Sequence, residues 1–145
     1  MNENLELLEY MYKSSGMGIN SLTDLLKELD DKKNKIKSDL SDELTKYENY
    51  HKKCKELLKK NKGEVEENSL MTKIMSKQGI KMEVKNDNSD SAIAHMIIEG
   101  LTMGVVDTET NLKNLSNKVD KKIYKLVNEY LKFQQEEIEK MKKYL

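Results

Sequence analysis

Apolar residues recur at alternating three- and four-residue steps in four long stretches of the chain, a spacing that places them on one face of an α-helix. These stretches begin at Leu5, Ile36, Ala94 and Val119, and no proline interrupts any of them. We therefore predict an all-α protein with four helices, at residues 3–30, 34–61, 90–116 and 118–145. N-cap candidates at residues 88–91 precede the third helix, and Gly63 offers a stop after the second.

The connection between the second and third helices, residues 63–89, exceeds the ~12–15 residues at which a loop in a compact domain is already long. Its apolar cluster, Leu70, Met71, Ile74 and Met75, predicts a short helix of one or two turns, and residues 80–84 predict an extended stretch. We expect a crossover that joins two helical hairpins, residues 1–62 and 90–145. The whole chain, residues 1–145, would then form a single four-helix bundle.

The two predicted hairpins match each other at a constant offset of 86 positions. The Met17-Gly18 step falls on Met103-Gly104. The second helices pair in the same way, as Tyr47 with Phe133, Glu48 with Gln134, and His51 with Glu137. Because one offset serves both helices without an insertion, the hairpins read as an internal repeat. The alternative is that two amphipathic hairpins of equal length agree at many buried positions by chance.

The composition supports long amphipathic helices and argues against nucleic acid as a partner. Apolar residues make up 37% of the chain and charged residues 36%, which leaves wide polar faces and narrow apolar ones. The 26 basic residues are all lysines and are balanced by 26 acidic residues. Without arginine, the chain lacks the planar group that best recognises phosphate and guanine.

The lone cysteine, Cys54, excludes a disulfide framework and a cysteine-based zinc site. The first residues lack a basic region before an apolar run, so we expect no secretory signal and a cytoplasmic location. The most apolar stretch, residues 92–106, is interrupted by His95 and Glu99 and is shorter than the ~20 residues that a membrane-spanning helix needs. We therefore expect no membrane association.

Two long helical hairpins joined by a crossover form the plan of the ferritin-like bundle, in which the second helix of each hairpin carries a Glu-x-x-His step. The segment Glu48-Asn49-Tyr50-His51 resembles this step. The chain is also similar to small uncharacterised ferritin-like proteins of Gram-positive bacteria. The similarity lies in residues 7–11 (LLEYM), 17–19 (MGI), 73–82 (KIMSKQGIKM) and 99–104 (EGLTMG). For the metal-binding members, the resemblance implies six di-iron ligands: a Glu from the first helix of each hairpin and a Glu-x-x-His from the second.

The residues expected at the mid-height of the bundle do not fit a di-iron centre. Counting from the hairpin turns places Ser15 and Leu101 where the first and third helices should present carboxylates. In the fourth helix, Gln134 takes the place of the Glu, and Glu137 takes the place of the His. We therefore predict no bound metal and no cofactor. If a metal binds, its candidate ligands are Glu48, His51 and Glu137, with Glu9, Glu99 or Asp107 approaching only if the helices are rotated.

We expect the polar side chains at this height to bond to one another, because a buried polar group without a partner costs roughly 1–3 kcal/mol. His51 is the centre of this interpretation, with Tyr12 as its expected partner and Glu137 as the next candidate. The predicted mid-bundle polar network consists of Tyr12, Ser15, Glu48, His51, Gln134 and Glu137.

Few features of the sequence indicate catalysis. Cys54 could act as a nucleophile with His51, three residues earlier on the same helical face, as its base. However, Cys54 also fits the buried apolar face, and no Gly-rich phosphate loop or Walker pattern is present. We predict that the protein is not an enzyme.

Gly18 and Gly104 occupy equivalent positions and would let helix backbones approach closely, or leave a ligand-sized gap beside Met17 and Met103. The third helix is apolar on more than its buried face. The residues left over on it are Met96, Ile97, Met103 and Val106. Because surplus apolar faces usually mark an interface, we expect a homodimer, with an unidentified protein partner as the alternative.

Two functional interpretations remain open at this point. The first is a non-catalytic ferritin-like bundle with a structural or partner-binding role, whose metal site has been lost. The second is a metal-binding ferritin-like protein with an atypical site.

Overall fold

The chain was analysed as a computed structural model that describes residues 2–63 and 87–145. Four α-helices lie in these ranges, α1 (Glu3–Glu28), α2 (Lys37–Lys60), α4 (Asp90–Leu115) and α5 (Lys121–Met141). Short 3-10 turns follow α4 at Ser116–Lys118 and α5 at Lys142–Tyr144. The described residues contain no strand, so the prediction of an all-α protein with four helices is confirmed. The short helix and the extended stretch predicted within residues 70–84 lie outside the described residues.

The helix ends differ from the predicted bounds by up to four residues, because local hydrogen bonds decide them. Asn2 caps α1 by accepting a hydrogen bond from the backbone N–H of Leu5 at 2.9 Å. Of the four N-cap candidates before α4, Ser89 is the cap, and its hydroxyl accepts from the N–H of Ala92 at 3.1 Å. The fourth helix was predicted from residue 118, but a 3-10 turn occupies residues 116–118 and α5 begins at Lys121.

The end of α2 uses Gly63 differently from the predicted glycine stop. Lys62, not Gly63, adopts the left-handed conformation, with φ 60°. The N–H of Gly63 then donates to the carbonyl of Leu58 at 2.7 Å. A Cβ atom on Gly63 would lie 2.6 Å from Leu58 Cδ2, so the glycine is needed here for close approach.

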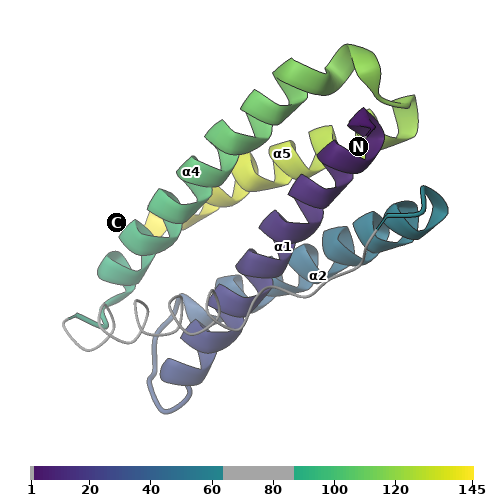
Figure 1. Ribbon diagram of the computed structural model, residues 1–145. Coiled ribbons are helices and arrows are strands. Elements are labelled where there is room, and N and C mark those ends of the chain that lie inside the picture. Colours follow the sequence, from purple (N-terminus) through teal and green to yellow (C-terminus); the bar gives the residue numbers. More distant parts are fainter. Residues whose placement is uncertain (1, 64–86) are drawn as a thin grey trace.

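Each helix packs mainly on its neighbour in the sequence, α1 on α2 and α4 on α5, as Figure 1 shows. Further contacts join α1 to α4, α1 to α5 and α2 to α5. The buried apolar side chains of all four helices form one core. The turn between α1 and α2 is tied to the start of α4, since Asp90 Oδ1 accepts from Asn34 Nδ2 at 2.9 Å.

Aromatic rings fill the contact between α2 and α5. The rings of Tyr47 and Phe133 meet edge to face, with centroids 4.9 Å apart. Tyr130 lies at 6.2 Å from Tyr47, and Tyr50 lies at 5.3 Å from Phe133. Tyr130 also bonds to α1, because its hydroxyl lies 2.7 Å from Ser14 Oγ. This cluster fixes the register between the two helix pairs.

Candidate functional site

The structure divides the predicted mid-bundle polar residues into separate groups. Ser15 is fully buried, and its Oγ lies 2.8 Å from His51 Nδ1 and 2.8 Å from the carbonyl oxygen of Met11. The Tyr12 ring stacks on His51, with centroids 4.2 Å apart and planes 20° apart. Ser15 is therefore the residue that hydrogen-bonds His51 Nδ1, whereas we expected Tyr12, which instead covers the ring face.

This Ser–His contact does not have the arrangement of a nucleophile and its base. A serine hydroxyl has a single hydrogen, and the Met11 carbonyl is an acceptor that cannot supply one. The geometry is satisfied when Ser15 donates to Met11 and accepts from the Nδ1–H of His51. A hydroxyl bonded in this way is not activated for attack.

Glu48 does not join these residues, because its side chain is exposed on α2. The neighbouring residue, Tyr47, faces the core instead and is only 7% exposed. The candidate metal ligands Glu48, His51 and Glu137 are thus not brought together. Within the two described ranges, no three His, Cys, Asp or Glu side chains lie close enough to hold a metal ion.

Gln134 belongs to a second group, which links three helices. Thr108 Oγ1 on α4 lies 2.9 Å from Gln134 Oε1 on α5 and 2.9 Å from the Tyr10 hydroxyl on α1. Both Thr108 and Gln134 are buried. Burial raises the pKa of Tyr10, so this hydroxyl remains protonated and able to donate. The sequence analysis named Gln134 as part of a polar network but named neither Thr108 nor Tyr10 as its partner.

Glu137 belongs to a third group, a pair of buried carboxyl groups. The sequence analysis named Glu137 but missed its neighbour Glu43. Glu43 on α2 is 2% exposed and Glu137 on α5 is 1% exposed. Lys46 Nζ lies 3.7 Å from Glu137 Oε2, and Lys140 Nζ lies 3.9 Å from Glu137 Oε1. Glu137 thus has two cationic neighbours, although its Oε1 accepts no hydrogen bond from the described residues.

Glu43 is in a less favourable position than Glu137. Its Oε1 is buried without a hydrogen-bond partner among the described residues. Burial, followed by the negative charge of Glu137, raises the pKa of Glu43 to about 8. Burial also raises the pKa of Glu137, an effect that the two lysines oppose. At neutral pH, Glu43 is therefore mostly a neutral acid facing an ion-paired carboxylate.

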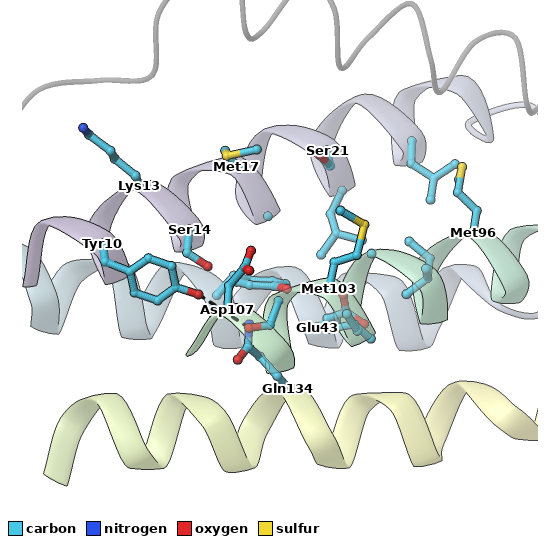
Figure 2. A pocket seen from close by; sticks show the side chains of 18 residues that line it. Tyr10, Lys13, Ser14, Met17, Ser21, Glu43, Met96, Met103, Asp107 and Gln134 are labelled. Atoms are coloured by element: carbon cyan, nitrogen blue, oxygen red, sulfur yellow. Dashed lines mark hydrogen bonds between the residues drawn. The ribbon is translucent and has the colours of Figure 1, made fainter. Parts of the chain in front are cut away.

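A cavity of about 560 Å³ lies between α1 and α4, and α2 and α5 close its inner end. Its walls are mainly apolar. Glu43 and Tyr47 on α2 and Gln134 on α5 also line it, and Figure 2 labels Glu43 and Gln134. Met17 and Met103 stand at the entrance with 49% and 69% of their surface exposed. The repeated Met-Gly steps thus lie beside a gap between α1 and α4, one of the two arrangements considered from the sequence.

The glycines of these steps make room for side chains rather than for a neighbouring backbone. A Cβ atom on Gly18 would lie 2.5 Å from the Tyr47 ring, and one on Gly104 would lie 2.6 Å from Gln134 Nε2. Gly100, which also lines the cavity, differs because a Cβ atom there would meet nothing within 4 Å. Position 100 therefore offers space for a larger side chain at the cavity.

Cys54 has the environment of a core residue. It is fully buried, and its Sγ donates to the carbonyl oxygen of Leu8 at 3.1 Å. Burial raises the pKa of the thiol to about 12, which keeps it in the unreactive protonated form.

Comparison of the chain with models of known protein families, with curated proteins and with solved structures finds no match. In the part of the chain that the structure describes, no helix is long and apolar enough to cross a membrane. The cavity and the polar groups around it are therefore the features from which a function is argued.

Proposed function

We propose that the chain is a non-catalytic binding protein on a ferritin-like four-helix plan, and that it binds an apolar ligand in the cavity between α1 and α4. The observation that carries this proposal is the cavity itself, whose volume of about 560 Å³ lies within the range of small-molecule sites. An apolar ligand in this cavity would remove the apolar lining and its own surface from water.

The ferritin-like plan is supported by the pairing of consecutive helices, α1 with α2 and α4 with α5. It is also supported by the long stretch between α2 and α4, which such a plan uses to carry the chain from one hairpin to the other. The internal repeat and a cytoplasmic location stay predictions.

The alternative, a metal-binding bundle with an atypical site, has less support. His51 Nδ1 is bonded to Ser15, Glu48 is exposed, and Glu137 is paired with Lys46 and Lys140. A metal bound at His51, Glu48 or Glu137 would need further ligands from residues that do not point toward that site. Metal analysis of protein purified without a chelating tag decides between the two functions, since stoichiometric metal that His51→Ala removes would favour the alternative.

The binding proposal is tested with the neutral fluorescent probe N-phenyl-1-naphthylamine, whose emission rises in an apolar site. Gly100→Phe places a bulky ring at a residue that lines the cavity and has free space around it, so probe affinity should fall at least tenfold. Thr102→Phe is the matched control, because Thr102 is exposed on α4 and does not line the cavity. Probe binding that is absent in the wild type, or equal in all three proteins, would refute the proposal.

Self-association stays a separate prediction. Val106 on α4 is 57% exposed and adds to the apolar surface of Met103. A homodimer over this face would remove both from water. Sedimentation velocity tests it, and a monomer up to high micromolar concentration would exclude a stable homodimer.

A further inference from the structure

Glu43 is a buried ionisable group at the cavity whose presence the fold itself does not explain. It lies on α2 among the cavity-lining residues (Figure 2), and 98% of its surface is covered, since its exposure is 2%. One of its two oxygens has no hydrogen-bond partner among the described residues. A carboxyl group in this state is costly unless something supplies a donor to it.

The charged groups around Glu43 pair with one another and leave Glu43 without a cation of its own. Glu137 faces it from α5, and the two lysines nearby, Lys46 and Lys140, form ion pairs with Glu137. Lys140 is shared further with Asp39 at 3.7 Å and Asp42 at 4.0 Å, and Asp39 also pairs with Lys143 at 2.7 Å. No ion pair of the described residues includes Glu43. The complementary occupant of this end of the cavity is therefore a cation that can donate hydrogen bonds.

The remaining lining fits the apolar part of such an occupant. Leu22, Leu25 and Ile97 provide hydrocarbon walls, and the Tyr47 ring offers an aromatic surface that attracts cations. The other charged lining residues are Lys13 and Asp107, both exposed and opposite in sign, so they add no net charge.

We infer that the cavity binds an apolar molecule that carries a protonated primary amine, and that the ammonium group pairs with the carboxylate of Glu43. This inference rests on the proposed function and specifies the class of its ligand. A fatty carboxylate would lie beside the carboxylate of Glu137, which carries a charge of its own sign. A neutral alcohol would offer one uncharged hydrogen bond, whereas an ammonium group offers three charge-assisted ones.

Competition with N-phenyl-1-naphthylamine at pH 7 tests the inference, with decylamine, decanol and decanoate as competitors of equal chain length. We expect decylamine to bind at least tenfold more tightly than decanol, and decanoate to bind most weakly. In Glu43→Gln, the amine-to-alcohol ratio should fall close to one. Glu48→Gln, an exposed acid on the same helix, is the matched control and should keep the wild-type ratio.

A calorimetric measurement on the wild type tests the same pairing without a variant. Because burial raises the pKa of Glu43 above neutral pH, pairing with an ammonium group should release protons, up to one per molecule bound. Titrations in buffers of different ionisation enthalpy measure this number, and decanol should release none.

The outcomes separate this inference from the proposed function. Equal affinity for amine and alcohol, a ratio that survives Glu43→Gln, or amine binding without proton release would overturn the amine inference alone. Failure of the probe and of all three competitors to bind would overturn the proposed function as well.

Discussion

Replacing Glu43 by glutamine should change how stability depends on pH, because the native state holds this carboxyl group in its neutral form. The pKa of Glu43 is raised from 4.5 to about 8 in the folded protein. Between these two values the unfolded chain is ionised while the folded chain keeps its proton. The contribution of Glu43 is therefore fully present below about pH 4.5 and is lost as pH rises through about 8.

The size of the effect follows from proton linkage. A difference of one bound proton changes the free energy of unfolding by about 1.4 kcal/mol per pH unit, so Glu43 should lower stability by at most about 4 kcal/mol between pH 5 and pH 8. Glutamine has nearly the same shape and does not titrate. The pKa of Glu137 is also raised, but Glu137 is present in both proteins. Its contribution therefore largely cancels when their pH dependences of stability are compared.

Urea unfolding followed by circular dichroism at pH 5, 6.5 and 8 measures the effect. Between pH 5 and pH 8, the free energy of unfolding should fall by several kcal/mol less in Glu43→Gln than in the wild type. Glu48→Gln, which removes an exposed carboxylate from the same helix, should follow the wild type. Parallel curves for the wild type and Glu43→Gln would refute the assignment of a neutral buried acid.

Three further predictions concern stability. Gly100→Ala should stabilise the protein by about 0.5–1 kcal/mol in urea unfolding, because α4 gains helix propensity and the new Cβ meets nothing. Gly18→Ala should instead destabilise it by about 1–3 kcal/mol through the clash with the Tyr47 ring, and equal effects of the two would contradict this contrast. His51→Ala should lower the free energy of unfolding by roughly 1–3 kcal/mol by removing the partner of buried Ser15, and a loss that appears only with added metal would contradict this.

The helices could be predicted from the sequence because their apolar spacing is sustained and uninterrupted. Their ends could not, since they depend on contacts between distant segments. For example, Asn34 bonds to Asp90, and the N–H of Lys35 lies 3.3 Å from the same carboxylate, so residues 34–36 form a turn instead of the first turn of α2.

The candidate site was predictable only in part, because three- and four-residue steps leave the exact buried position open. On the second helix, the apolar residue Leu44 is only half-buried, whereas its charged neighbour Glu43 is buried. The sequence analysis also placed Glu48 in the mid-bundle polar network, although its side chain is exposed. The cavity depends on the separation of α1 and α4, which no local pattern encodes, although the repeated Met-Gly steps marked its position.

The aromatic cluster between α2 and α5 gives the protein an internal spectroscopic reporter. The chain has seven tyrosines and no tryptophan, so its near-ultraviolet circular dichroism arises chiefly from tyrosine. Tyr47 and Tyr130 are both buried in this cluster, at the boundary between the two helix pairs. A state in which the pairs separate while each stays helical would lose the near-ultraviolet signal and keep the far-ultraviolet one. Comparing the two transitions therefore shows whether the pairs unfold together or one after the other, without any introduced label.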